Sequence, residues 1–264
     1  MLTIIHNVYL RNPFVRDSVL LNLMSLKQSK IPYQYILFND HGDSEIEDDI
    51  KEFIDGDGFE YIYSNKNYGF QMCSGGWVGA IPYIKGKYIN NIGQDDVFTS
   101  MFYRNSYQYL ESSSDVYLTF ANCFNVKEDL TINGLGMNLQ TPFDYNNPLQ
   151  AFMDWFGVDC NKVTRANNNM MAPGTVYRTS LHELIGIPDV ETFRGVCDFE
   201  YWARILFNKY KCHYLPEPTW LYRRSEYTAG NAMIDGKPNR EYWHKHYVEK
   251  VKQKYSILWD NLER

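Results

Sequence analysis

Residues 87–96 read KYINNIGQDD, and this stretch decides the predicted fold. Lys87–Ile92 has the length and apolar content of a buried strand, and the chain then turns through a glycine into the adjacent carboxylates Asp95 and Asp96. Adjacent like charges repel, so a folded protein keeps such a pair where water or a cation neutralises it. Three roles are open: a cation site, a solvated turn, or an N-terminal cap of the helix expected over Phe98–Leu110.

Strand-like and helix-like patterns alternate before this stretch. The expected strands are Leu2–Ile5, Tyr35–Phe38 and Glu60–Tyr63, and the expected helices are Val15–Leu26, Glu45–Ile54 and Gln71–Ile84. Such alternation is typical of parallel strands joined by helical crossovers. We therefore predict an α/β fold with a mostly parallel central sheet flanked by helices. Ligands of these sheets bind beyond the carboxyl ends of the strands, where polar turns follow the second, third and fourth strands.

The rest of the chain continues the pattern less regularly. Its expected elements are the strands Asp115–Phe124, Gly174–Arg178, His213–Leu215 and Trp220–Arg223, and the helix Asp198–Phe207. Between residues 125 and 169 the pattern gives way to Asn, Gly and Pro, which indicates long functional loops. Arg240–Leu262 has helical spacing, so we expect a C-terminal helical tail.

The composition of the chain limits the classes of protein to which it can belong. A chain of 264 residues with 44% hydrophobic residues can bury a large core, which excludes global disorder. The net charge of -6 argues against a nucleic-acid binder that neutralises many phosphates. Five scattered cysteines indicate reduced thiols, and no apolar run approaches the roughly 18 residues of a membrane span. The sequence therefore predicts a soluble, cytoplasmic protein that binds no nucleic acid.

Three motifs in order carry a family resemblance. They are SNKNYG at residues 64–69, GAIPYIKGKYI at residues 79–89 and QDD at residues 94–96. This order resembles family two, the largest family of inverting glycosyltransferases with the GT-A fold. Its members carry an Asn-x-Gly segment, a helix ending in Lys/Arg-Gly-x-Tyr-Ile and an acidic pair after the next strand.

The resemblance covers roughly residues 1–225 and implies a domain organisation. A GT-A glycosyltransferase domain is expected over 1–225, with a nucleotide-binding half at 1–97 and an acceptor-binding half at 98–225. Residues 226–264 would form a C-terminal helical extension.

The resemblance also implies a nucleotide site. Asp40 matches the residue that reads the base edge, and Asp95 matches a position near the ribose. Lys66 and Asn67 would lie beside the nucleotide. The alternatives are that Asp40 only holds its own turn and that Lys66 is a solvated side chain.

Asp96 matches the family position that coordinates a divalent cation. Mn²⁺ and Mg²⁺ prefer oxygen and typically take one or two carboxylates plus phosphate oxygens, which stabilises a nucleoside diphosphate leaving group. The family often supplies a further histidine ligand in Tyr-Arg-x-His, but here Ser225 stands at its position. Arg223 and Arg224 are expected to clamp the phosphates, with solvated surface arginines as the alternative.

The general base is expected at the start of the helix Asp198–Phe207. This segment resembles the Glu-Asp-x-x-x-x-x-Arg helix of the family, with Cys197 in place of the first acid and Asp198 as the base. Phe199, Trp202 and Leu206 share one face and should point to the core, whereas the i,i+4 pair Glu200 and Arg204 should lie on the surface. A simple N-cap role is the alternative for Asp198.

The predicted function is inverting, metal-assisted sugar transfer. The donor would be a UDP-, GDP- or dTDP-linked sugar, and the acceptor a hydroxyl of a glycan, a lipid-linked molecule or a protein. A non-catalytic nucleotide- or glycan-binding module is the alternative, because Cys197 and Ser225 depart from the family pattern. The apolar face of the tail would pack against the domain or a second subunit, or lie on a membrane surface.

Two other enzyme classes are disfavoured. A sugar-phosphate nucleotidyltransferase usually carries a glycine-rich loop after the first strand, and His6–Arg16 contains no glycine. A glycoside hydrolase needs two acids at a defined separation, which nothing in the sequence fixes.

Overall fold

The computed structural model describes residues 1–9, 14–43, 45, 48, 50–51, 58–66, 72–135, 173–225, 233–234, 236–238 and 245–262. The expected helix Glu45–Ile54 and the expected loops over 125–169 lie largely outside these residues, as does the start of the tail helix.

The strands and helices follow one another in this order: β1 Leu2–Val8, α1 Val15–Ser29, β2 Tyr33–Asn39, β3 Phe59–Tyr63, α3 Met72–Ala80, η2 Ile81–Tyr83, β4 Tyr88–Ile92, β5 Val97–Phe98, α4 Ser100–Ser112, β6 Val116–Val126, β7 Ile132–Leu135, β8 Thr175–Arg178, α6 Leu181–Ile185, α7 Val190–Phe193, η5 Arg194–Val196, α8 Cys197–Phe207, β9 Lys211–Arg223, β10 Met233–Ile234, β11 Lys237–Pro238 and α9 Lys245–Leu262.

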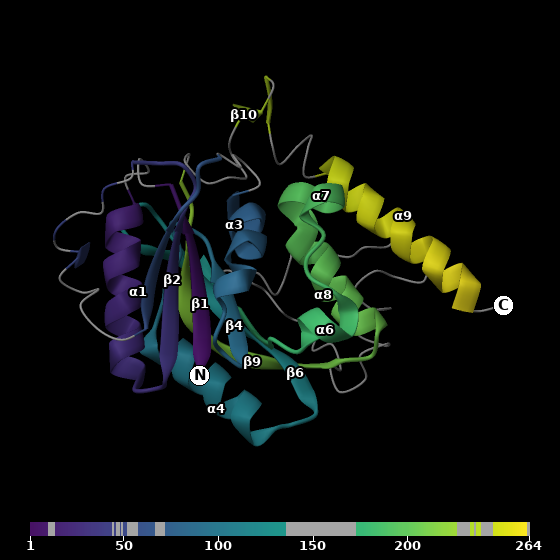
Figure 1. The fold of residues 1–264 in the computed structure, drawn as a ribbon, viewed down its shortest axis with the longest axis horizontal. Helices are drawn as coiled ribbons and strands as arrows, with labels where there is room; N and C mark the ends of the chain where they lie inside the picture. The colour runs from purple at the N-terminus through teal and green to yellow at the C-terminus, as the bar shows by residue number, and fades with distance from the viewer. Residues whose placement is uncertain are drawn as a thin grey trace.

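The first four strands form the parallel unit that the alternation predicts. β3, β2, β1 and β4 are neighbours in this order, and all three pairings are parallel. Their carboxyl ends therefore lie at one edge of the sheet, which faces upward in Figure 1. Val8 pairs with Asn39 and His6 with Ile92, so the turns after β1, β2 and β4 are close together.

The complete sheet is mixed, so the prediction of a mostly parallel sheet is wrong. β8 lies antiparallel between β4 and β6, and β5 pairs antiparallel with β9. β6 and β9 are parallel to each other. The two strands expected at His213–Leu215 and Trp220–Arg223 are one long strand, β9, whose register shifts along β6. Periodicity reveals a strand but not its direction or its neighbours, which depend on contacts between distant residues.

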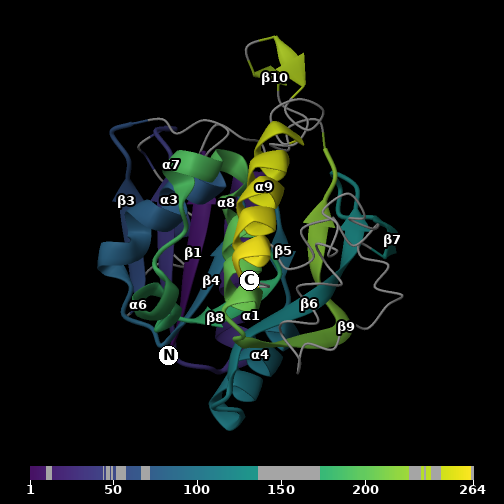
Figure 2. The same ribbon diagram turned by 90° about the vertical axis from the view of Figure 1, so that its right-hand side faces the viewer.

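Alternate residues of the central strands point to opposite faces of the sheet and pack into two separate cores. In β1, Ile4 and Val8 pack with α1 and α4, whereas Ile5 packs on the opposite face with α3 and α8. β2 divides in the same way between Leu37 and Ile36. The sheet therefore lies between two helical layers, as Figures 1 and 2 show.

The C-terminal helix α9 packs on the outside of α8 (Figure 2). Its residues Tyr247, Val251 and Tyr255 are buried in the same core as α8. Among the described helices, none combines the length and the hydrophobicity that crossing a bilayer requires.

Candidate functional site

The acidic pair occupies the turn between β4 and β5 and is withdrawn from water. Asp96 is 3% exposed, and two carboxylate oxygens, Asp95 Oδ2 and Asp96 Oδ1, are buried without a hydrogen-bond partner among the described residues. Burial raises the pKa of Asp95 to about 6. Burial also raises the pKa of Asp96 well above its usual range, and the neighbouring charge of Asp95 adds to this rise. Two buried, unpartnered acid oxygens require a proton or a cation.

Two alternatives for the acidic pair are thereby removed. The pair is not a solvated turn, because Asp96 is buried and Asp95 is half-buried. It is also not the cap of the following helix, since α4 begins at Ser100 and the side chain of Thr99 accepts the hydrogen bond from Phe102 N.

Helix α1 holds the backbone of the acidic turn through Asn22. The amide of this buried residue donates to Asp96 O at 3.0 Å, and its Oδ1 accepts from Phe98 N at 2.8 Å and from Tyr103 OH at 3.3 Å. An asparagine in a helix interior is a weak helix former, so its position indicates this tertiary role. Asn22 is a residue of the site that the sequence pattern alone does not reveal.

Arg223 reaches the acidic turn from the end of β9. Its Nε donates to Asp95 O at 3.1 Å, its Nη1 donates to Glu128 O, and its guanidinium lies 4.5 Å from the centre of the Phe14 ring. Its Nη2 is buried and has no partner among the described residues. Arg223 is therefore not a solvated arginine.

Arg224 has different surroundings. Its side chain is exposed, donates to Asn125 Oδ1 at 3.2 Å and lies over the ring of Tyr222. The neighbouring Ser225 is 7% exposed.

The turn after β2 contains Asp40, which is buried and whose N–H donates to Val8 O at 2.8 Å. The side chain of Asn39 shapes this turn: Oδ1 accepts from Gly42 N at 3.0 Å, and Nδ2 donates to Asp43 O at 2.7 Å. Asn39 Nδ2 also donates to Tyr61 OH at 2.8 Å. The side chain of Asn39 therefore makes turn-forming hydrogen bonds after β2.

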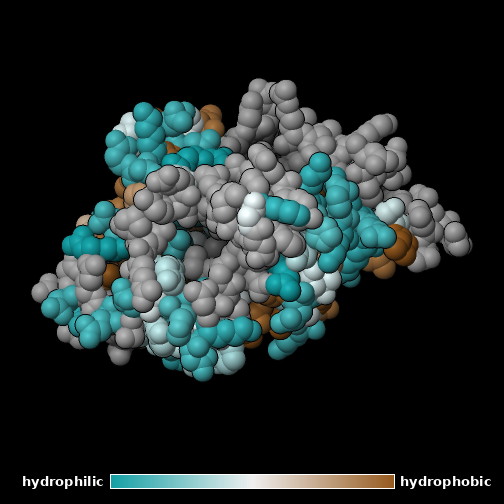
Figure 3. Space-filling model, turned by 90° about the horizontal axis from the view of Figure 1, so that it is seen from above, coloured by the Kyte–Doolittle hydropathy of each residue, from teal (hydrophilic) through white to brown (hydrophobic). Residues whose placement is uncertain are grey.

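Lys66 follows β3 in a tight turn beside the end of β2. Ser64 Oγ donates to Lys66 O at 2.6 Å, and Ser64 N donates to Asn39 O at 2.9 Å. The Lys66 side chain is exposed. Asn67 lies outside the described residues. Viewed from this end of the molecule, the described surface is mostly hydrophilic (Figure 3).

Beneath the turns, β1 carries the buried polar residues His6 and Asn7. The His6 Nδ1 contacts Tyr35 OH, and burial lowers the pKa of His6 to about 3, so the imidazole is neutral. Asn7 Nδ2 donates to Asn91 Oδ1 and to Ile92 O, which supports the end of β4. The position of these residues on a buried strand could not be read from the short apolar run of the sequence.

Asp198 lies in the first turn of α8, and its Oδ1 accepts from Phe199 N at 2.7 Å. Val196 is the N-cap of α8, so Asp198 is not an N-cap. Phe199, Trp202 and Leu206 are buried, which confirms the predicted core face. In Figure 1, α7 and the start of α8 lie at the end of the molecule where β1, β2 and β4 terminate.

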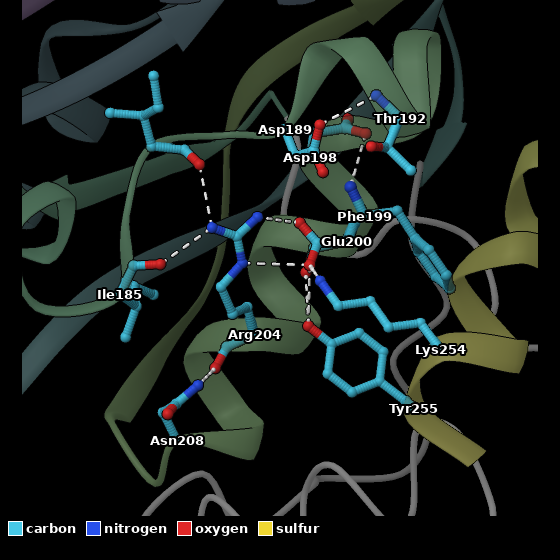
Figure 4. Close-up of polar contacts among 11 residues, drawn as sticks. Ile185, Asp189, Thr192, Asp198, Phe199, Glu200, Arg204, Asn208, Lys254 and Tyr255 are labelled. Atoms are coloured by element: carbon cyan, nitrogen blue, oxygen red, sulfur yellow. Dashed lines mark hydrogen bonds and ion pairs between the residues drawn. The ribbon is translucent and has the colours of Figure 1, made fainter. Parts of the chain in front are cut away.

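The predicted surface position of Glu200 and Arg204 is wrong. Glu200 is fully buried, and its carboxylate binds Arg204 by a salt bridge, Lys254 Nζ at 2.6 Å and Tyr255 OH at 3.0 Å (Figure 4). Helical spacing does identify the Glu200–Arg204 pair. It cannot show that α9 covers it, because the covering residues follow more than fifty positions later.

The carboxylates of Asp95 and Asp96 suit a hard divalent cation. Buried carboxylate oxygens without partners are the ligands that Mn²⁺ and Mg²⁺ prefer, and both ions commonly complete their shells with phosphate oxygens and water. The described residues contain no group of three His, Cys, Asp or Glu side chains placed to hold a metal. Of the described residues, Asp95 and Asp96 would therefore be the protein ligands of the cation.

Comparisons of the sequence with protein-family models and with curated proteins find no match. The structure, in contrast, is similar to those of sugar-nucleotide-binding proteins. S. aureus TarS residues 1–349 in complex with UDP-GlcNAc superposes with a TM-score of 0.62 and 12% identity, over 95% of this chain and 65% of that one. The mannosyltransferase PcManGT from Pyrobaculum calidifontis in complex with GDP-Man and Mn²⁺ gives 0.59 and 10%, over 97% and 64%. The chain shares their fold. It spans less than two-thirds of each of these structures.

Proposed function

We propose that this protein is a nucleotide-sugar-dependent, inverting glycosyltransferase. The observation that carries the proposal is the acidic pair of half-buried Asp95 and buried Asp96 beyond the carboxyl end of a strand. One buried carboxylate oxygen of each has no hydrogen-bond partner among the described residues. This edge of the sheet is where α/β folds bind their ligands. The fold similarity to proteins solved with UDP-GlcNAc and with GDP-Man supports a nucleotide sugar as that ligand.

The nucleotide would be bound by the turns after β1–β4 and by β9. Asp40 would accept the ring N–H of the base, Lys66 and Asn67 would lie beside the nucleotide, and Asp95 would lie near the ribose. Arg223 Nη2 is a buried donor that no described residue engages, which suits a diphosphate oxygen. Arg224, which is exposed, would contribute only charge.

Asp96, together with Asp95, would hold the divalent cation. A bound Mn²⁺ or Mg²⁺ supplies positive charge to the departing diphosphate. Because Ser225 replaces the histidine of the family pattern, phosphate oxygens and water would complete the shell.

Asp198 would act as general base. It would take the proton of the acceptor hydroxyl while that oxygen attacks the anomeric carbon from the side opposite the diphosphate, which inverts the configuration. Its place in the first turn of α8 favours the ionised carboxylate, because the helix dipole is positive there. The acceptor class is a glycan, lipid-linked or protein-bound hydroxyl.

Calorimetry with UDP, GDP and dTDP, each with and without Mn²⁺, tests the proposal together with an assay of sugar-nucleotide hydrolysis. We expect one nucleotide to bind, and to bind more tightly with Mn²⁺. The Asp96→Asn variant should lose the Mn²⁺-dependent part of the affinity and at least about 100-fold of the hydrolysis rate. Asp115→Asn is the matched control, because Asp115 forms a surface ion pair with Lys211. An Asp96→Asn protein as active as the parent would refute the metal site.

The same nucleotide-binding measurements, together with sugar-transfer assays, distinguish a glycosyltransferase from a non-catalytic binding module. Cys197 favours this alternative, because its side chain is packed in the core where the family carries an acid. Nucleotide binding without sugar transfer to any of a broad set of acceptors would support the module, whereas transfer would exclude it.

A further inference from the structure

We infer that the C-terminal helix α9 positions the general base, because Lys254 and Tyr255 clamp Glu200 two residues beyond Asp198 on α8. This inference rests on the proposed role of Asp198. It assigns Glu200, Lys254 and Tyr255 as positioning residues that do not touch the substrate.

Glu200 is the centre of a polar cluster that joins three helices (Figure 4). Its carboxylate accepts hydrogen bonds from Arg204 in the next turn of α8 and from Lys254 and Tyr255 on α9. The Tyr255 hydroxyl also lies 3.4 Å from the backbone Glu200 O. Arg204 Nη1 in turn donates to Ile185 O, the last residue of α6, at 3.0 Å.

The charges of the cluster make it specific for one position of α8. A fully buried carboxylate is costly unless cations and hydrogen bonds compensate it, and here Arg204 and Lys254 both do so. Any movement of α8 along α9 would break these contacts together. The cluster therefore selects one register of the two helices.

The first turn of α8 depends on this support. Its N-cap, Val196, makes no side-chain hydrogen bond, and the preceding Arg194 adopts a positive φ of 46°. Lys254 also lies 5.2 Å from the centre of the Phe193 ring, at the end of α7. The clamp thus holds both the helix that carries Asp198 and the segment that leads into it.

Hydrogen exchange of residues 194–207, combined with transfer kinetics, tests the inference. Lys254→Met should speed exchange in the first turn of α8 at least about fivefold. It should lower kcat about tenfold with the donor KM within about twofold, because a displaced base slows the chemical step and leaves nucleotide binding intact. Tyr255→Phe, which removes only a hydroxyl, should show smaller changes in the same direction.

Conservative and charge-removing variants separate positioning from stability. Lys254→Arg, which keeps the cation, should keep kcat near that of the parent. Glu200→Gln should lower kcat as Lys254→Met does, since it leaves the cations of Arg204 and Lys254 without their carboxylate. Lys250→Met is the matched control on the exposed side of α9 and should leave exchange and kcat unchanged.

Two outcomes would overturn the inference. One is exchange in Lys254→Met no faster than in Lys250→Met; the other is a lower melting temperature with unchanged kcat, which would show a merely structural cluster. A parent protein that transfers no sugar would refute the proposed function and the catalytic part of this inference. The exchange comparison would still decide whether α9 holds α8.

Discussion

Arg223 and Arg224 are adjacent in the sequence, yet their side chains have different surroundings. Arg223 is 2% exposed and bonded to the carbonyls of Asp95 and Glu128, whereas Arg224 is exposed and bonded to Asn125. Arg223 is the last residue of β9 and lies beside the acidic turn, whereas Arg224 follows the strand and its side chain reaches the surface.

Arg223→Met should therefore be damaging and Arg224→Met nearly neutral. The first leaves two carbonyl groups without their donor and should cost about 2–4 kcal/mol of unfolding free energy, with about a tenfold loss of donor affinity. The second should change stability by less than about 0.5 kcal/mol. Urea denaturation and calorimetric donor titration measure both quantities. Equal losses in the two variants would contradict the assignment of Arg223.

His6 makes folding stability depend on pH. Its pKa is about 3 in the folded protein and 6.5 as a model value, chiefly because burial disfavours the cation. Between about pH 6.5 and pH 3, His6 therefore binds a proton in the unfolded chain but not in the folded protein. The stability that neutral His6 contributes is complete above pH 6.5 and is lost as the pH falls toward 3.

This loss should amount to about 1.4 kcal/mol per pH unit, and hence to about 2 kcal/mol between pH 6.5 and about pH 5. His6→Asn keeps an acceptor for Tyr35 OH but does not titrate, so its stability should fall less steeply over this range. Urea denaturation at several pH values checks the difference. Parallel pH profiles for the two proteins would show that His6 is not the source.

At the scale of elements, α3 lies unusually close to the sheet at Gly76. A Cβ there would lie 2.0 Å from Asn7 Oδ1 and 2.8 Å from Phe38 Cδ1. The glycine allows α3 to pack against β1 and β2 just beneath the acidic turn.

Gly76→Ala should destabilise the protein by about 1–3 kcal/mol, because the clash outweighs the roughly 1 kcal/mol that alanine contributes within a helix. Thermal or urea denaturation gives the value. Gln108→Ala, at an exposed position of α4, is the control and should stay within about 0.5 kcal/mol of the parent. A Gly76→Ala protein more stable than the parent would show that α3 can move away from the sheet.

At the scale of the whole molecule, α9 shares the core of the α/β sheet. Tyr247, Val251 and Tyr255 are buried with α8 and with the face of the sheet that carries Ile5 and Ile36. The boundary at residue 226 comes from the extent of the family resemblance, whereas these three residues after it lie in the same core as α8.

A chain ending at residue 244 should therefore be unstable. Three buried side chains contribute about 1.5–3 kcal/mol each, and their loss is comparable to the entire stability of an ordinary domain. Circular dichroism melting of the shortened chain, compared with the parent, measures the effect. A shortened chain that melts at the parent temperature would show that residues 1–225 fold alone. That result would agree with the predicted division into a domain and a C-terminal extension.

The sequence alone determined the parallel unit β1–β4, the place of the acidic pair beyond a strand, and the core face of α8. These features depend on periodicity and on residues that are neighbours along the chain, such as Phe199 and Trp202. Only the tertiary structure decided that β8 runs antiparallel, that Arg223 meets Asp95 across 128 positions, and that Glu200 is buried under α9. Contacts of this kind are set by which distant segments pack together, and burial then decides whether a charged residue is a solvated side chain or part of a site.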